Sequence, residues 1–193
     1  KTIRSHTKEA KKIPTDIIMN GDTFDFMKCP YKGMYPKHIT AAIAVAKIEK
    51  IAKAHPLFFN CLRQWLRTSP HSRIIFVHGN HDYDLVFEEV QQRIKELLAV
   101  DKKLRSRIIF AGWEFTDNLL HVEHGSQLDE MFRVDPDKFI LHSPKHMIKE
   151  PFLQLPWGYN ALYDHFIKVK ERYPLLERIL PRKHLFQFMP IYV

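Results

Sequence analysis

Hydrophobic and polar positions alternate along this chain between short apolar runs and longer amphipathic stretches. Short apolar runs bounded by Gly, Pro or polar residues predict buried strands at 15–20, 73–77 and 107–112. Between and after them, apolar side chains recur at helical spacing and predict helices at 38–53, 57–67 and 87–100. A turn at 115–118 and a returning strand at 119–122 complete the pattern. This alternation predicts an α/β layered core domain over residues 1–139.

The pattern changes after about residue 140, where the strand pattern ends and proline-punctuated helical stretches begin. Helices are predicted at 152–170 and 173–180. We interpret residues 140–185 as an inserted helical cap. The apolar run at 186–193 indicates a return to the core as a strand.

Three polar clusters follow predicted strands directly. They are G-D-T-F-D at 21–25, G-N-H-D at 79–82 and V-E-H-G at 122–125. In open α/β sheets, ligands bind at the carboxyl ends of the strands, so these clusters are expected to face one ligand. Carboxylate, amide oxygen and imidazole together suit Mn, Fe or Zn. Each cluster alone is also compatible with an ordinary turn, but together they predict a shared two-metal site for phosphate chemistry.

The charge balance indicates an anionic partner without identifying it. The net charge of +8 and the isoelectric point near 9.4 fit nucleic acid, an acidic membrane surface or a phosphorylated substrate. Cys29 and Cys61 are far apart, which suits a reducing compartment, and we expect a cytoplasmic protein, with peripheral membrane contact as an alternative. The chain contains neither a P-loop nor a serine-hydrolase elbow.

The three clusters, taken in order, resemble the calcineurin-like metallophosphoesterase superfamily. The family pattern is D-x-H, G-D-x-x-D, G-N-H-[DE], H and G-H-x-H, and its second, third and fourth parts match over roughly residues 13–130. The resemblance implies a two-sheet sandwich flanked by helices and two divalent metal ions, with Mn expected and Fe or Zn as alternatives. No D-x-H precedes Asp22 and no G-H-x-H occurs before Val193. We expect truncation or disorder to explain the first absence, and the second as well, because the next strands are due where the sequence stops. In a complete chain, the site would hold only half of its ligands.

Residue by residue, the resemblance implies a role for each matched side chain. Asp22 would bridge both metals, and Asn80 and His124 would bind the second metal. His81 would face the phosphate, to stabilise the transition state or protonate the leaving oxygen. Asp82 would hold the His81 imidazole in the useful tautomer. Asp25, in contrast, is expected only to support the turn around Asp22.

The segment after E-H-G resembles the cap of bacterial phosphoesterases similar to UDP-diacylglucosamine hydrolases. It contains P-F-L-Q-L-P-W-G-Y-N at 151–160 and E-R-Y-P-L-L-E-R-I-L-P at 171–181. The resemblance implies a hydrolase, a metal-dependent phosphatase in the broad sense, that cleaves a phosphodiester or pyrophosphate by attack of a metal-bound hydroxide. A nucleotide-sugar or lipid is the expected substrate. The alternatives are a nuclease of the same superfamily and an inactive phosphoesterase fold that serves as a binding module.

Overall fold

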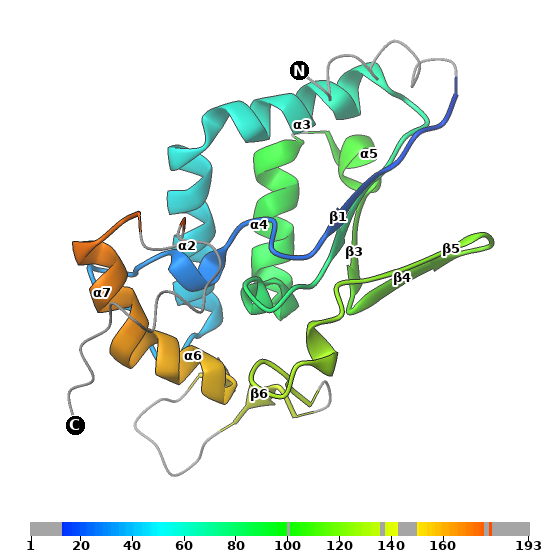
Figure 1. Cartoon of the computed structure of the whole chain (residues 1–193). Coiled ribbons are helices and arrows are strands. Elements are labelled where there is room, and N and C mark those ends of the chain that lie inside the picture. The colour runs from blue at the N-terminus through cyan, green and yellow to red at the C-terminus, as the bar shows by residue number, and fades with distance from the viewer. Residues whose placement is uncertain (1–12, 100, 136–137, 143–149, 176–177, 179–193) are drawn as a thin grey trace.

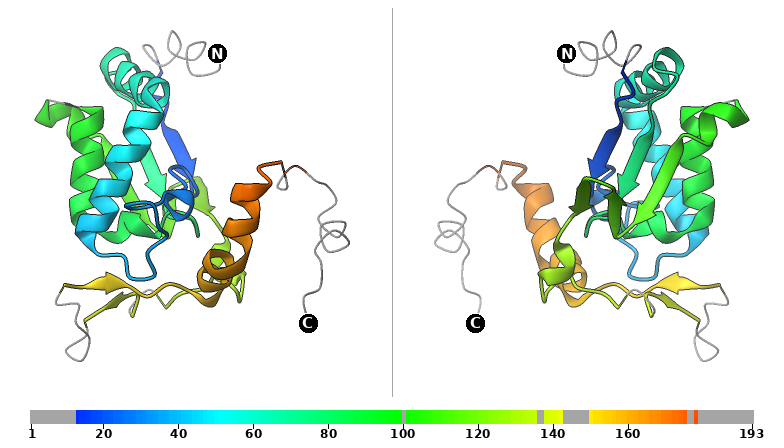
Figure 2. Two further views of the ribbon diagram at one scale, coloured as in Figure 1. Left: turned by 90° about the vertical axis from the view of Figure 1, so that its left-hand side faces the viewer. Right: turned by 90° about the vertical axis from the view of Figure 1, so that its right-hand side faces the viewer.

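A three-stranded parallel sheet forms the centre of the fold. The computed structural model describes residues 13–99, 101–135, 138–142, 150–175 and 178. The strands β1 (Ile17–Asn20), β2 (Ile74–Val77) and β3 (Ile108–Gly112) lie in the order β1-β2-β3. Figure 1 labels the two outer strands, and Figure 2 shows all three side by side. All four residues of the central strand β2 are buried, which explains its unbroken apolar sequence.

Helices cover one face of this sheet. They are α2 (Ala41–Ala54), α3 (Pro56–Thr68) and α4 (Glu88–Leu98), followed by the short α5 (Lys102–Arg105) (Figure 2). Thr40 caps α2, because its hydroxyl accepts a hydrogen bond from the Ile43 N–H. Pro56 occupies the first position of α3, where its missing N–H costs nothing. The predicted mixed α/β class is therefore confirmed.

A two-stranded antiparallel hairpin leaves the sheet after β3. It consists of β4 (Glu114–Asp117) and β5 (Leu120–Glu123) and projects away from the helices (Figure 1). The predicted hairpin is confirmed, but its turn lies at 118–119 and not at 115–118. The polar sequence of β4 explains the difference, since one side of an exposed hairpin needs few apolar residues.

Three short helical turns follow the polar clusters, and a second small sheet lies further along the chain. The turns are η1 (Phe26–Lys28), η2 (Tyr83–Val86) and η3 (Ser126–Leu128). Strands β6 (Ile140–Leu141) and β7 (Phe152–Leu153) pair antiparallel. The predicted end of strand structure at 140 was therefore wrong. Two-residue strands have no readable period, and β7 depends on a distant partner, with Leu153 N–H donating to Ile39 O at 2.9 Å.

A continuous helical stretch ends the described part of the chain. It comprises α6 (Trp157–Ala161), the π-helical turn η4 (Leu162–Phe166) and α7 (Ile167–Arg172). Tyr159, Tyr163 and Ile167 belong to the same buried cluster as the sheet residue Phe76. The described part of the predicted cap thus packs directly on the core. The strand predicted at 186–193 and the end of the helix predicted at 173–180 lie outside the described residues.

Candidate functional site

The three polar clusters meet at one edge of the fold. Strands β1 and β2 are parallel neighbours, so the loops that follow them leave the sheet at the same edge. The third cluster follows β5 of the hairpin and reaches that edge by a different route. There the Asn20 side-chain amide donates to the Glu123 carbonyl at 3.1 Å. The structure therefore brings together the loops that the sequence predicted to share a ligand.

Two glycines allow these loops to approach closely. A Cβ on Gly79 would overlap the Asp22 backbone nitrogen and carboxylate. A Cβ on Gly21 would overlap the His124 ring and lie 2.9 Å from the Gly79 Cα, and Gly21 also has a φ of +76°. Both positions therefore require glycine, the second for steric and conformational reasons together.

Asp22 lies at the centre of the site and contacts both other loops. Its φ of 48° is left-handed, a conformation that Asp tolerates better than most residues. Its Oδ1 accepts a hydrogen bond from the His81 backbone N–H at 2.9 Å, and its Oδ2 lies 3.5 Å from His124 Nε2. About a third of the Asp22 side chain is exposed, so a ligand could reach it.

The His81 imidazole is paired with Asp25. The distance between His81 Nδ1 and Asp25 Oδ1 is 2.7 Å, and Lys28 Nζ lies 3.0 Å from the other oxygen of the same carboxylate. Burial raises the pKa of Asp25, but the hydrogen bonds from His81 and Lys28 outweigh it and hold the pKa below its usual range. The structure therefore pairs His81 with Asp25 and not with Asp82, the residue expected to orient it. Asp25 also supports its turn, as expected, because its carbonyl accepts a hydrogen bond from the Lys28 N–H at 3.0 Å.

Asp82 instead joins its own loop to the loop after β1. Its buried carboxylate accepts hydrogen bonds from the backbone N–H groups of Thr23, Phe24 and Phe26, at 3.1 Å for Phe24 and 3.5 Å for Phe26. Burial raises the pKa of Asp82 to about 7, against the opposite pull of these N–H groups. The Asp82 carboxylate is thus engaged by the backbone of the loop after β1, while the His81 ring is engaged by Asp25.

The donor atoms at this edge fit part of a metal site. Asp22 and His124 approach to 3.5 Å, close to the roughly 3.0–3.4 Å that separates two ligands of one ion bound at about 2.1 Å. His124 Nδ1 is buried and has no hydrogen-bond partner among the described residues. Asn80 lies on the same loop, directly before His81, and its side chain carries an amide oxygen. Within the described ranges, however, no three or more His, Cys, Asp or Glu residues are grouped to hold a metal ion.

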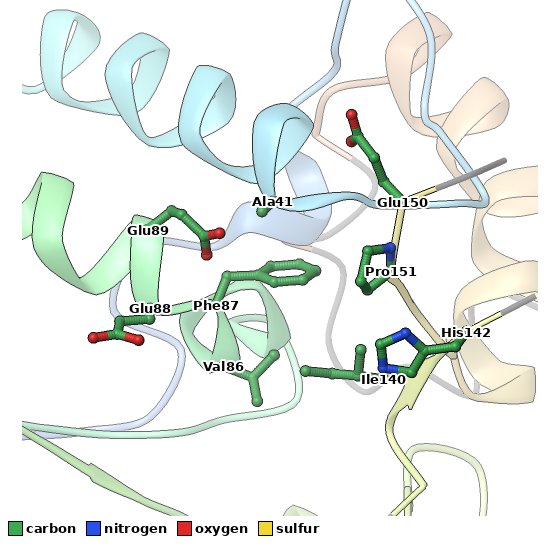
Figure 3. A pocket seen from close by; sticks show the side chains of 9 residues that line it. All are labelled: Ala41, Val86, Phe87, Glu88, Glu89, Ile140, His142, Glu150 and Pro151. Carbon is green, nitrogen blue, oxygen red and sulfur yellow. The ribbon is translucent and has the colours of Figure 1, made fainter.

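A separate cavity of about 430 Å³ lies beside the N-termini of α2 and α4 (Figure 3). None of the predicted site residues lines it. Its walls are mainly apolar, with Phe87 and Ile140 among them, and Glu88, Glu89 and Glu150 lie around it. Glu88 and Glu89 stand in the first turn of α4, where acidic side chains stabilise a helix through its dipole. The charges of Glu88 and Glu89 therefore have a structural explanation, which does not extend to Glu150.

Two contributors to the site were missed in the sequence. The role of Asp25 could have been found from G-D-T-F-D itself, since its second carboxylate follows the first by three residues and lies on the same turn. Tyr159 donates from its hydroxyl to the Asn80 carbonyl at 2.7 Å. No sequence signal joins these residues, because 79 positions separate them.

Comparisons with known proteins give no match to this chain, whether with family models, curated proteins or solved structures. In the part of the chain that the structure describes, no helix has the length and apolar character needed to cross a bilayer.

Proposed function

We propose that this protein is a divalent-metal-dependent phosphoesterase of the calcineurin-like type. The observation that carries the proposal is the pairing of His81 with Asp25 directly beside Asp22 and His124. An oriented imidazole next to a carboxylate–imidazole pair suits hydrolysis of a phosphate ester better than it suits a structural turn. The expected class is a phosphoric ester or pyrophosphate hydrolase.

The metal-binding residues of the proposal are Asp22, Asn80 and His124. Asp22 would be shared between two ions, and Asn80 and His124 would hold one of them, with Mn²⁺ as the expected metal. Bound metal ions would supply Lewis-acid stabilisation of phosphate charge and an activated water molecule. The strained backbone at Asp22, its bond to the His81 N–H and the required glycines fix the carboxylate in place before any ligand arrives.

His81 would act on the phosphate through its second nitrogen. Because Nδ1 is engaged by Asp25, Nε2 is the atom that can donate a proton to the leaving oxygen or a hydrogen bond to a phosphate oxygen. Asp25 fixes the orientation of the ring by placing its carboxylate beside Nδ1. Asp82, by contrast, would act only through the loop that it holds.

The finer fold and the substrate class belong to the same proposal. The parallel sheet would be one layer of a two-sheet sandwich, and the hairpin of β4 and β5 would belong to the other. Residues 140–185 would form the cap. The net charge of +8 supports an anionic substrate, and a nucleotide-sugar or phospholipid with a phosphodiester or pyrophosphate bond is the proposed class.

The experiment is hydrolysis of an aryl phosphodiester by the full natural chain, with Mn²⁺ and then with excess chelator. We expect Mn²⁺-dependent turnover that Asp22→Asn abolishes and that His71→Ala, at an exposed histidine, leaves unchanged. Turnover that survives both the chelator and Asp22→Asn would contradict the proposal. Absent turnover in a protein that still binds Mn²⁺ would favour a binding module, and preference for an oligonucleotide would favour a nuclease.

A further inference from the structure

One helical stretch contacts all three loops that carry the candidate site. The Tyr159 hydroxyl, on α6, donates to the Asn80 carbonyl at 2.7 Å, and the Tyr163 hydroxyl, on η4, donates to the Met27 carbonyl at 3.1 Å. Between these two loops, the Met27 N–H donates to the His81 carbonyl at 3.1 Å. The two tyrosines therefore hold the loops after β1 and β2 from the same helix.

The third loop is joined to the same helix at Gly158. Its N–H donates to the Met131 carbonyl at 2.9 Å, just beyond η3 and the His124 cluster. A Cβ at position 158 would lie 2.8 Å from both Met131 O and a ring carbon of Phe132. The Tyr83 hydroxyl, from the loop after β2, also donates to the Phe132 carbonyl. The contact at Gly158 is thus too close for a Cβ, although less tight than the contacts at Gly21 and Gly79.

Tyr159 is rigidly held in this arrangement. Its side chain is completely buried, and its ring packs against the rings of Tyr83 and Tyr163, each with a centroid distance of 5.5 Å. A buried ring fixed on two sides can place its hydroxyl accurately. The hydroxyl meets the backbone of Asn80, a proposed metal ligand, and that residue directly precedes His81. The position of this bond suits control of the loop more than general packing.

We propose that Tyr159 is a positioning residue, through which docking of α6 sets the place of the Asn80–His81 loop. The catalytic consequence of this inference rests on the proposed phosphoesterase function. Its structural part rests on the three hydrogen bonds that Gly158, Tyr159 and Tyr163 donate to the loops. It makes the segment after residue 150 part of the machinery of the site, in addition to any contact with substrate. Binding of metal at the site should then favour docking of α6, and docking of α6 should favour binding of metal.

The test compares Tyr159→Phe with Tyr173→Phe in the full chain. Tyr173 lies at the end of the same helical stretch and is 54% exposed, so it is a matched control. The first readout is amide hydrogen exchange with and without Mn²⁺. Loss of the hydroxyl should speed exchange over residues 79–83 about five- to tenfold, as removal of one hydrogen bond predicts, with α2 and α4 unchanged. In the wild type and in Tyr173→Phe, addition of Mn²⁺ should slow amide exchange in α6. In Tyr159→Phe this slowing should disappear.

The second readout is steady-state hydrolysis at saturating Mn²⁺. We expect kcat to fall about 10-fold or more in Tyr159→Phe, with KM within about twofold and Tyr173→Phe at the wild-type level. The inference would be overturned if Tyr159→Phe left the exchange rates of residues 79–83 unchanged. It would also be overturned if the exchange rates in α2 and α4 rose as much as those of residues 79–83. Absence of turnover in the wild type would defeat the proposed function instead, while exchange would still decide whether Tyr159 holds the loop.

Discussion

At the scale of single residues, two of the carboxylates at the site, Asp25 and Asp82, have the same chemistry and different tasks. Asp25 faces the imidazole of His81 and stays partly exposed, at 37% of its side chain. Asp82 is buried, and its carboxylate accepts hydrogen bonds from three backbone N–H groups of the described residues. Their surroundings, and not their distance along the chain from His81, decide which of them can assist a reaction.

Asp25→Asn should therefore impair catalysis and leave stability almost unchanged. The amide keeps the shape of the side chain but loses the charge that faces His81, so we expect kcat for a phosphodiester to fall on the order of 100-fold. The melting temperature should stay near that of the wild type, because the group is partly solvated. Steady-state kinetics and a thermal unfolding curve on the same sample test both halves.

Asp82→Asn should show the opposite balance. In the wild type, backbone N–H groups donate to both oxygens of Asp82. In the variant, an NH₂ group replaces one of these oxygens and cannot accept a hydrogen bond, so the free energy of unfolding should fall by about 1–3 kcal/mol. Urea denaturation measures this loss. If Asp82→Asn proved stable but catalytically dead, while Asp25→Asn kept full activity, the assignment of the two carboxylates would be reversed.

The residues of the candidate site could be predicted from the sequence, but not all of the residues that they contact. Asp22, Asn80, His81 and His124 stand in the loops that the clusters predicted. In the structure His81 pairs with Asp25 and not with Asp82, and the Asp25 backbone is left-handed, with φ 52°. That conformation is set by the packed loops and has no signature in residue order.

At the scale of secondary-structure elements, a buried ion pair ties α2 to η2, the turn directly after the second cluster. Lys47 Nζ lies 2.8 Å from Asp84 Oδ1, and both side chains are essentially inaccessible to solvent. Lys47 also lies over the Phe26 ring, at 5.5 Å from its centroid. Such a pair fixes relative position more than it adds stability, because desolvation offsets much of the attraction.

Lys47→Met should therefore destabilise the fold strongly. The change leaves Asp84 buried and unpaired, and we expect the free energy of unfolding to fall by about 3–5 kcal/mol. The double variant Lys47→Met with Asp84→Leu should recover much of this loss, because both charges are then gone. Chemical denaturation of the two single variants and the double variant forms a complete cycle. Losses that simply add would contradict a direct pairing.

The long amphipathic and apolar segments were predictable, since their periods are set by burial on one face. The helices α2, α3 and α4 and the strands β1, β2 and β3 all lie within about three residues of their predicted bounds. The pair β6 and β7 was not predictable, because two-residue strands have no readable period. The second of them is also held from a distance, since the Leu153 N–H donates to the Ile39 carbonyl.

At the scale of the whole molecule, the site depends on the close packing of three loops. Where they meet, at Gly21 and Gly79, there is no room for a side chain. Gly79 has an ordinary backbone conformation, so its requirement is purely steric. The sequence indicated that the clusters converge, because parallel strands share an edge. It could not indicate that the stretch from Gly158 to Tyr163 would hold all three loops, since that depends on packing between distant segments.

Gly79→Ala should separate the loops without unfolding the protein. The new methyl group would displace Asp22, and we expect hydrolysis to fall at least about 10-fold, with a stability loss of about 1–3 kcal/mol. Circular dichroism should show an unchanged content of helix. Full activity in this variant would mean that the close approach of Gly79 to Asp22 has no part in the site.

The central claim is that this edge of the sheet binds divalent metal through Asp22 and His124. The most direct test is elemental analysis of the full natural chain after loading with Mn²⁺ and removal of free ions, beside Asp22→Asn and His124→Ala. We predict about two Mn²⁺ per wild-type chain and a clear loss in both variants. A wild-type protein that retains no Mn²⁺, or variants that retain as much as the wild type, would contradict the account.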